Sequence, residues 1–467
     1  MNKAGSLTLR VVLAALALFC LGGLWLVIAV MALRLPLDPN EGWNAYHAAA
    51  AMAGAPLYPG PPGFMVNNYP PLSFYLAGAV GRILGDNIFA GRLVSLLSLG
   101  AIAFGMFSAA RHMGCKRFEA VFAPLLFVAG MLVFTDYVAM DDPQLLAHAI
   151  AMAGFLVLLR EPRPATSIAA AALLFVLAFF VKHNVIVMAV AVTAWFALED
   201  RRSALRLAGF GIAFALMGLV IFRLTYGVNL LTVLYSARTF TLENFREGLQ
   251  NWLHWSLVSL VGFVILVAYR GTDRYVRLCA IFAGFGVAIG LCFMGGAGVD
   301  ANVMFDADIA LALGAALLFS WLESATWQAA AAVAYIAPLF VAAWMNGGED
   351  WRNAEAWLHP RREEAALAQK DIAFLETRKG PALCEMQSFC YWAHKPAAVD
   401  VFNVGEQFDT GARSDELLTR QIVARRFAVI QFNPDSPYSL GENVHNAVAR
   451  AYRLDHEDDF GDFYVPR

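Results

Sequence analysis

The sequence predicts an α-helical protein that crosses a membrane many times and carries a small α/β domain at its C-terminal end. Of the 467 residues, 59% are hydrophobic and only 15% are charged, whereas soluble proteins are usually about 45–50% apolar and about 25% charged. The apolar residues gather in runs that suit membrane helices, each of which needs roughly 20 residues. Residues 346–467 alone have the mixed composition of a soluble domain.

Eleven apolar runs are candidates for membrane spans, and the basic residues between them orient the chain. With a cytoplasmic N-terminus, the arginine and lysine clusters all fall inside, and the acidic and aromatic segments 34–87, 136–143, 223–252 and 295–305 fall outside. The first run is too long for a cleaved signal peptide, so we expect an uncleaved anchor. The runs lie near 9–33, 88–110, 118–135, 144–159, 165–181, 184–198, 204–222, 253–269, 275–294, 306–322 and 326–345.

The first outer loop, residues 34–87, is expected to be ordered. Apolar residues recur at helical spacing from Trp43 to Met52, which predicts one helix. The apolar stretch 70–84 is about 15 residues long, which is short for a crossing. We therefore expect a second helix that lies in or dips into the outer interface, joined to the first by the Pro- and Gly-rich link 56–62.

The C-terminal segment 346–467 is expected to fold as a separate domain. Alternating helical and strand-like patterns predict helices near 352–377 and 415–425, with strands at 382–386, 397–402 and 427–432. An odd number of spans places this domain outside the membrane. Cys384 and Cys390 can pair there if the space is oxidising, and two free thiols are the alternative.

Carboxylates flank the outer side of two predicted spans. Asp38 and Glu41 are three residues apart and can share one face of a helical turn, which suits deprotonation of a hydroxyl nucleophile. The structural alternative is a helix cap followed by a first-turn acid. Asp142, at the outer end of the fourth span, raises the same question, because acids at a membrane edge are costly unless wet or paired. Standing before a proline, Asp142 can also simply start a helix.

Lys182, His183 and Asn184 join two apolar runs almost without a loop, on the outer side. A lysine there departs from the positive-inside trend. Its compact charge suits a phosphate group, and His183 and Asn184 can donate hydrogen bonds beside it. The alternative is that Lys182 extends to ordinary lipid headgroups.

Weaker signals come from three further places. Asn68 and Tyr69, followed by two prolines, are typical of a platform for a sugar or headgroup. Arg92 flanks the same outer region and can bind phosphate or pair with a local acid. Asn302 ends a glycine-rich loop, 295–302, that matches no phosphate-loop pattern but can line a cavity.

Several classes of function are disfavoured. A net charge of −3 offers no basic surface for nucleic acid. No clustered metal-ligand spacing occurs along the chain, so we expect no cofactor, and a divalent cation is not indicated. In the outer segment 223–252, which contains Arg238, an ordinary interfacial helix is favoured over a site.

Together, the outer carboxylates, a lysine for phosphate and apolar walls for a lipid tail fit transfer of a group from a lipid-phosphate donor. The chain resembles the GT-C superfamily of polyprenyl-phosphate-sugar-dependent glycosyltransferases, and within it the bacterial relatives of protein mannosyltransferases and of lipid A aminoarabinose and galacturonic acid transferases. The order of motifs carries the resemblance: Asp38 to Gly54, Tyr69-Pro70-Pro71, Gly91-Arg92-Leu93, Asp142-Pro143, Lys182-His183-Asn184 and Asn302.

The resemblance implies a GT-C fold with a catalytic domain over 1–345. It implies transfer, with inversion, of a hexose or pentose from a polyprenyl-phosphate donor to a hydroxyl of a cell-envelope lipid, glycan or protein. The chain would lie among lipids of the cytoplasmic (inner) membrane, with its C-terminal domain in the periplasm or outside the cell. In the family the base belongs to an Asp-Glu pair, but here Asn40 precedes Glu41, so either Asp38 or Glu41 is the expected base.

Other residues take supporting roles by the same resemblance and by their chemistry. Asp142 would support the base, and Lys182 would contact the donor phosphate. The further candidates are His183 and Arg92 for the phosphate, and Asn68, Tyr69, Asn184 and Asn302 for the substrates.

Two other functions compete with this interpretation. A transporter or flippase of lipid-linked glycans needs polar residues along a path through the membrane, whereas charged residues are sparse within the predicted spans. A non-catalytic envelope assembly subunit would use the outer domain for partners, and substitution of Asp38 and Glu41 would then leave activity in cells intact.

Overall fold

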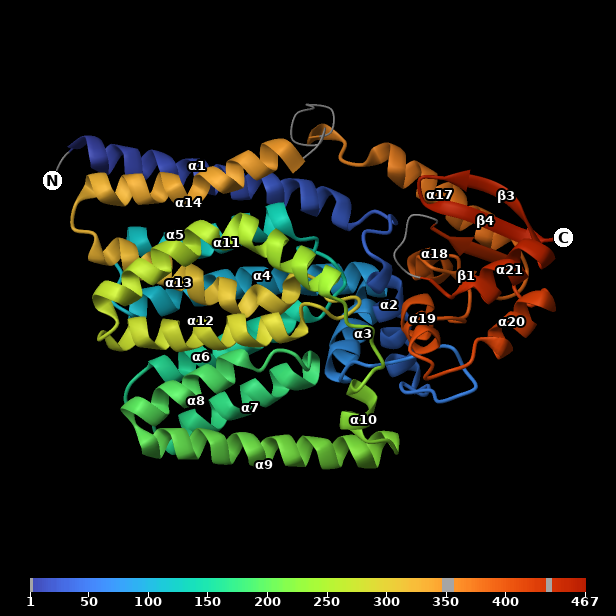
Figure 1. Ribbon diagram of the computed structural model, residues 1–467, viewed down its shortest axis with the longest axis horizontal. Coiled ribbons are helices and arrows are strands. Elements are labelled where there is room, and N and C mark those ends of the chain that lie inside the picture. Colours follow the sequence, from blue (N-terminus) through green and yellow to red (C-terminus); the bar gives the residue numbers. More distant parts are fainter. Residues whose placement is uncertain (1–2, 347–356, 434–438) are drawn as a thin grey trace.

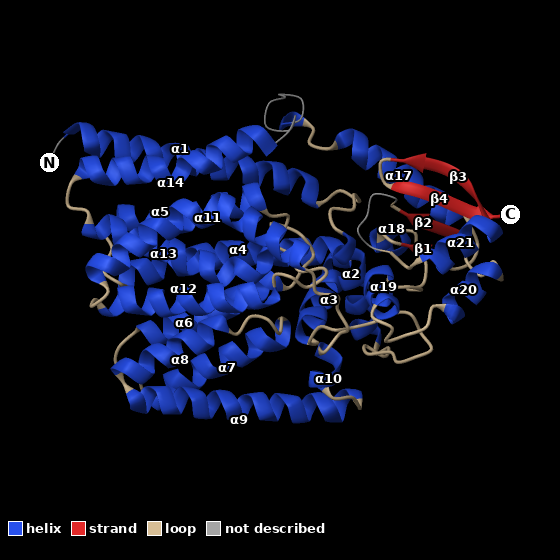
Figure 2. Cartoon of the chain, in the orientation of Figure 1, coloured by secondary structure: helices blue, strands red, loops and turns tan. Residues whose placement is uncertain are grey.

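The computed structural model describes residues 3–346, 357–433 and 439–467. Long helices lie side by side in an elongated bundle, and a small domain of helices and strands covers one end of it (Figure 1). Strands occur only in that domain within the described chain (Figure 2).

Every one of the eleven apolar runs forms a helix, as predicted. Eight helices of the described chain are long and apolar enough to cross a membrane, and the chain is a multi-pass membrane protein. Three others, with 16, 17 and 13 residues, are apolar but shorter. The eleven are α1 (Lys3–Met31), α4 (Asn87–His112), α5 (Arg117–Phe134), α6 (Gln144–Leu159), α7 (Ala165–Val181), α8 (Val187–Glu199), α9 (Arg201–Tyr226), α11 (Leu242–Arg270), α12 (Arg274–Phe293), α13 (Phe305–Trp321) and α14 (Ala325–Asn346).

Helix α13 lies at the centre of the bundle, packed against α5, α11 and α12, and 89% of its apolar span is buried. Close packing depends on small residues: a Cβ on Gly314 would stand 2.3 Å from the Phe263 ring. At the edge of the bundle, only 11% of the span in α9 is buried. Its outward leucines and isoleucines suit contact with lipid chains.

The loops rich in arginine gather at one end of the bundle. Arg274, which begins α12, pairs with Glu161 between α6 and α7, and Arg277 pairs with Glu199 at the end of α8. The N-terminus lies at that same end, and the small domain lies at the other (Figure 1). The grouping of basic loops on one side of the membrane therefore agrees with the fold.

The first outer loop contains the two juxtamembrane helices that the sequence predicts, α2 (Pro39–Ala53) and α3 (Leu72–Leu84). Asp38 caps α2, and Gly54 ends it in the left-handed conformation, with a φ of 67°. Both helices lie at the end of the bundle next to the small domain, together with the short α10 (Leu230–Leu234). The single turn η1 (Ala301–Met304) leads into α13.

The C-terminal domain contains a four-stranded sheet in the order β1-β2-β4-β3. β1 and β2 are parallel, with Ala382 opposite Val429, and the other pairs are antiparallel. Cys384 and Cys390 form a disulfide. The elements are α17 (Arg362–Thr377), β1 (Ala382–Cys384), α18 (Gln387–Trp392), α19 (Val401–Asp409), α20 (Glu416–Val423), β2 (Val429–Phe432), α21 (Glu442–Ala451), β3 (Tyr452–Asp458) and β4 (Gly461–Pro466).

Two expectations for this domain differ from the structure. The strand expected at 397–402 is absent: only Val399 makes a bridge, to Phe64, and α19 begins at Val401 because Asp400 caps it. Strands β3 and β4 did not stand out in the sequence, because most outward residues of β3 are polar. The helix expected from 352 is seen as α17 from Arg362, and residues 352–356 lie outside the described residues.

The C-terminal domain packs directly on α2. The indole N–H of Trp43 donates to Asp400 at 3.0 Å, and the hydroxyl of Tyr46 donates to the Lys395 carbonyl at 2.7 Å. Gly42 permits this contact, because a Cβ there would stand 2.1 Å from the backbone nitrogen of Ser388 in α18. Glycine is thus required at position 42 by the approach of two backbones.

Candidate functional site

The acids and the lysine singled out in the sequence come together at the end of the bundle next to the C-terminal domain. Three segments carry them: the start of α2 with Asp38 and Glu41, the link between α5 and α6 with Asp142, and the link between α7 and α8 with Lys182. These links lie at the same end of neighbouring helices, which is why residues far apart in the chain become neighbours.

Glu41 and Arg92 form a fully buried ion pair. Arg92 Nε and Nη2 each donate to one carboxylate oxygen of Glu41 at 2.6 Å. The backbone N–H groups of Leu37 and Asp141 donate to the same carboxylate, at 3.1 and 3.2 Å. The remaining donors of Arg92 bind backbone carbonyls at the end of the first span, those of Met31, Leu33 and Leu35. The pair therefore fixes α1, α2 and α4 to one another, and neither side chain is exposed to a ligand.

Asp38 is placed differently. It is partly exposed at the start of α2, and its Oδ1 accepts the backbone N–H of Asn40 at 2.7 Å. Burial raises the pKa of Asp38 to about 7, and the negative charges of Glu41 and Asp142 add to this rise. A carboxylate with a pKa near 7 is suited to general-base work at neutral pH.

Asp142 and Lys182 form a second buried ion pair, with Nζ 3.0 Å from Oδ2. Asp142 also accepts the backbone N–H of Gln144 at 2.7 Å and so starts α6. Lys182 Nζ lies 3.7 Å from the centre of the Tyr69 ring. Burial lowers the pKa of Lys182, but the negative charge of Asp142 and the contact with Tyr69 outweigh this, and the pKa is raised overall. Lys182 is therefore a positive charge held below the surface.

His183 and Asn184 follow Lys182 and are partly exposed. His183 Nδ1 and Asn184 Oδ1 are buried polar atoms without a hydrogen-bond partner among residues 3–346, 357–433 and 439–467. Burial, together with the charges of Lys182 and Arg238, lowers the pKa of His183 to about 4. The ring is neutral at pH 7, so one ring nitrogen can donate a hydrogen bond and the other can accept one. Buried polar atoms of native proteins are nearly always paired, so these two are suited to a ligand.

Tyr69 contacts Lys182 through its ring, and Asn68 precedes Tyr69 in the same loop. Asn302 is connected to this cluster through α6. The loop that carries Asn68 and Tyr69 is ordered by Asn67, which accepts the Tyr69 N–H at 3.0 Å and donates to the Leu57 carbonyl at 3.0 Å. Asn302 donates to the side chain of Gln144 at 3.1 Å. It therefore contacts α6 rather than Lys182 directly.

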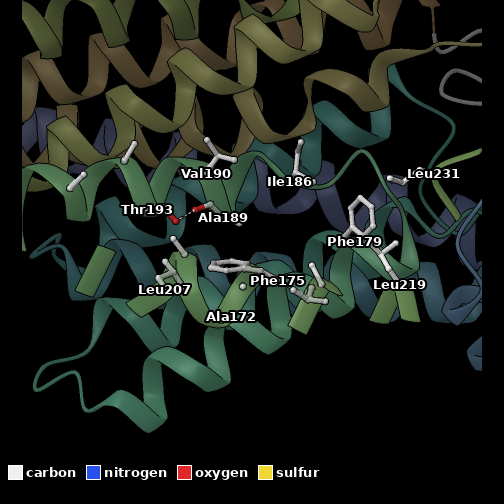
Figure 3. A pocket seen from close by; sticks show the side chains of 16 residues that line it. Ala172, Phe175, Phe179, Ile186, Ala189, Val190, Thr193, Leu207, Leu219 and Leu231 are labelled. Atoms are coloured by element: carbon white, nitrogen blue, oxygen red, sulfur yellow. Dashed lines mark hydrogen bonds between the residues drawn. The ribbon is translucent and has the colours of Figure 1, made fainter. Parts of the chain in front are cut away.

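An apolar cavity of about 560 Å³ opens between α7, α8 and α9, and its walls are almost entirely carbon (Figure 3). Phe179 and Ile186, which precede and follow the Lys182–Asn184 segment, both line it. Lys182 does not itself line the cavity, but in the chain it lies three residues after Phe179 and four before Ile186, which do.

Comparisons with known proteins identify the overall fold. Residues 68–226 match the model of the dolichyl-phosphate-mannose-protein mannosyltransferase family. ArnT from Cupriavidus metallidurans, solved with undecaprenyl phosphate, matches with a TM-score of 0.62 at 12% identity, over 97% of this chain and 98% of that one. Its apo structure matches with a TM-score of 0.63 at 12% identity, over 98% and 97% of the two chains. The chain has the GT-C fold.

A more distant GT-C neighbour is the oligosaccharyltransferase of Archaeoglobus fulgidus tethered to an acceptor peptide. It matches with a TM-score of 0.52 at 13% identity, over 98% of this chain and 74% of that one. Comparison with curated protein sequences gives no match. The resemblance to the GT-C superfamily that the motifs indicate is therefore confirmed at the level of the fold.

Two residues near these candidates were not singled out by sequence reasoning. Arg238, between α10 and α11, donates to Asn403 at 2.7 Å, stacks on Phe402 and lowers the pKa of His183. Asp400 receives the Trp43 N–H, and burial raises its pKa to about 6. The available signal for Arg238 was its basic charge in a segment, 223–252, that the sequence groups with the acidic and aromatic loops. No local signal pointed to Asp400, because its contact with α2 joins residues 357 apart.

Proposed function

We propose that this protein is an integral-membrane glycosyltransferase that moves a sugar from a polyprenyl-phosphate donor to a hydroxyl of a cell-envelope lipid, glycan or protein. The observation that carries the proposal is the position of the buried Lys182 in the chain between Phe179 and Ile186, which both line the apolar cavity. A lipid phosphate needs a cation for its headgroup and an apolar wall for its tail, and this part of the chain supplies both. Undecaprenyl phosphate, the ligand of the ArnT structure, is of this chemical class.

The donor lies with its tail in the cavity and its phosphate at Lys182. His183 donates to the phosphate through its buried and unpartnered Nδ1, and Asn184 accepts a hydroxyl group of the sugar through its unpartnered Oδ1. Arg238, whose charge is felt by His183, adds a second cation on the side of the C-terminal domain. Arg92 is not retained in this role, because its donors are directed to Glu41 and to backbone carbonyls.

Asp38 is the general base. It is partly exposed and its pKa is raised by burial to about 7, whereas Glu41 is buried and accepts four hydrogen bonds, two of them from Arg92. The negative charge of Asp142 raises the pKa of Asp38, and its carboxylate pairs with Lys182. Asp142 therefore lies between the base and the lysine that binds the donor phosphate.

The reaction follows from these placements. Asp38 takes the proton of the acceptor hydroxyl, and the oxygen attacks the anomeric carbon from the side opposite the lipid phosphate. The bond between that carbon and the phosphate oxygen breaks, and the polyprenyl phosphate leaves with its negative charge next to Lys182. The sugar configuration inverts because attack and departure occur on opposite faces.

The acceptor hydroxyl approaches from the side where α2 meets the C-terminal domain. A narrow groove of about 20 Å³, room for about one water-sized group, lies there and is lined by polar residues of both parts, among them Asn40, Glu385, Gln387, Asp400 and Asn403. Asn40 is two residues from Asp38, which brings the groove to the base. Amide and carboxylate groups of this kind suit hydroxyl-rich acceptors.

We place the site on the outer face of the cytoplasmic membrane, with the catalytic part in residues 1–345. The Cys384–Cys390 disulfide supports an oxidising compartment for the C-terminal domain. The gathering of the arginine-rich loops at the opposite end of the bundle supports a cytoplasmic location for that end.

Mass spectrometry of envelope glycolipids and glycans tests this function. Cells lacking the gene are compared with cells complemented by the wild type or by Asp38→Asn. We expect a sugar-bearing species that only the wild type restores. A flippase would relocate a lipid-linked glycan without a new glycosidic bond, and an assembly subunit would tolerate Asp38→Asn. Restoration of the same species by Asp38→Asn would exclude the proposed chemistry.

A further inference from the structure

Three potential metal ligands converge in the C-terminal domain, away from the candidate site. Asp371 is on α17, and His456 and Asp458 are on β3, the edge strand of the sheet. Their ligand atoms all lie within 4.8 Å of one another. His456 and Asp458 are two residues apart on a strand, so they face the same side, toward α17.

The distances suit a tetrahedral cation. His456 Nε2 lies 3.3 Å from Asp371 Oδ1 and 4.0 Å from Asp458 Oδ2. Bonds of about 2.0–2.2 Å to zinc place neighbouring donor atoms of a tetrahedron roughly 3.3 Å apart. The first distance agrees with this spacing, and a small rotation of the more exposed Asp458 satisfies the second.

The most enclosed of the three ligands has one carboxylate oxygen without a partner among the described residues. The side chain of Asp371 is only 3% exposed, and its Oδ2 has no hydrogen-bond partner within the described part of the chain. Burial raises the pKa of Asp371 to about 7, and the neighbouring charge of Asp458 contributes. A buried carboxylate facing a second carboxylate is unfavourable unless a proton or a cation lies between them.

The imidazole is already held in the orientation that a ligand needs. The His456 ring stacks on Phe463 at 4.5 Å and meets the edge of Phe374 at 4.9 Å. Its Nδ1 lies 3.3 Å from Asp455 Oδ2, which leaves Nε2 directed at Asp371 and Asp458. Metal-bound histidines commonly donate their other N–H to a carboxylate in this way.

We propose that Asp371, His456 and Asp458 bind one divalent transition cation, with Zn²⁺ preferred. One imidazole nitrogen and two carboxylates suit zinc better than calcium or magnesium, which favour oxygen ligands alone. The cation connects α17 to β3 at the edge of the sheet. Its role is to stabilise the domain, and it does not depend on the proposed sugar transfer.

Calorimetric titration of the full-length protein in detergent tests the site. The purified protein, without a polyhistidine tag and stripped with a chelator, is titrated with Zn²⁺. We expect one equivalent to bind, and we expect His456→Gln and Asp371→Asn each to weaken binding at least tenfold. Glu457→Gln is the matched control, because it removes a carboxylate from the same strand but on the opposite face. Absence of binding by the wild type, or equal binding by all four proteins, would overturn the proposal.

If a variant fails to fold, X-ray absorption of the zinc-loaded wild type identifies the atoms that bind the zinc. The expected shell contains oxygen and nitrogen at about 2.0–2.1 Å and no sulfur. A sulfur neighbour at about 2.3 Å would assign the bound zinc to a cysteine site instead and would refute this one.

Discussion

Arg92 holds Glu41 through two hydrogen bonds of 2.6 Å, although the residues are 51 positions apart and belong to different helices. Both are completely or almost completely buried. This pairing distinguishes the two acids at the start of α2. Glu41 is held in a closed ion pair, and Asp38 is therefore the acid that we propose as the base.

Glu41→Gln is expected to destabilise the protein while the folded fraction keeps sugar transfer. Loss of one partner leaves the Arg92 charge buried and uncompensated, which typically costs about 3–5 kcal/mol. Thermal unfolding in detergent, with transfer measured per folded protein, checks this. Normal stability with abolished transfer would instead make Glu41 the base.

Asp38→Asn is expected to lower kcat about 10²–10⁴-fold, the usual contribution of a general base, while the protein still folds. Asparagine caps a helix as well as aspartate does, so the Asn40 N–H keeps its acceptor. Asp273→Asn, which alters the cap of α12, is the matched control and should leave transfer unchanged. Substantial transfer by Asp38→Asn would remove Asp38 from the mechanism.

The rate of transfer is expected to depend on pH through Asp38. Because burial raises its pKa to about 7, the base is protonated below that value, and kcat/KM should rise up to about pH 7 and level off above it. A pH profile without this rise would contradict the assignment.

The contribution of Asp38 to stability should fall as pH rises, whereas the rate of transfer rises. Asp38 has a raised pKa in the folded state, so its contribution is fully present below the unfolded pKa of about 3.9. It is lost as pH rises through about 7. The wild type should therefore lose stability relative to Asp38→Asn between about pH 4 and pH 7, as measured by unfolding of both proteins across that range.

Lys182→Ala is expected to raise the KM for the lipid donor at least tenfold and to change the acceptor KM much less. The lysine is a buried cation in the segment between Phe179 and Ile186, two residues that line the cavity. The substitution also leaves Asp142 without its partner, so Asp142→Asn, which retains the lysine, is measured beside it. An unchanged donor dependence in Lys182→Ala would refute the phosphate role.

Gly211→Leu is expected to impair long-chain donors more than short-chain ones. Gly211 lines the apolar cavity, and a Cβ there meets no atom within 4 Å, so a larger side chain fits into the space that the lipid tail would take. Gly209 has the same free surroundings on the same helix but does not line the cavity. Gly209→Leu is therefore the control, and equal effects of the two substitutions would argue against a tail in the cavity.

Much of the architecture followed from local patterns. Runs of apolar residues were enough to locate every helix of the bundle, and helical spacing after Trp43 was enough to predict α2. The pattern failed where local cues were weak. At 397–402 an apolar stretch suggested a strand, but the side chain of Asp400 caps a helix instead. In β3, polar residues hid an edge strand.

The sequence pointed to several charged residues that lie together in the structure, but not to the pairs that they form. Asp142 and Lys182 each stood out as charges at a membrane edge, yet nothing in the sequence says that they meet, because they are 40 residues apart. Arg92 offered phosphate binding or an ion pair as equal possibilities until Glu41 was found beside it. Asp371 and His456 are 85 residues apart, so no metal-ligand spacing was visible.

Gly42 has a consequence for how the acceptor specificity of this protein can change over evolutionary time. Because α2 meets α18 backbone to backbone at this residue, the width of the neighbouring groove depends on main-chain atoms that substitution does not alter. New acceptors must then be accommodated by side chains at the rim, such as Glu385, Gln387 and Asn403. Relatives that retain a glycine at this position would share one groove width and differ in the polarity of its border.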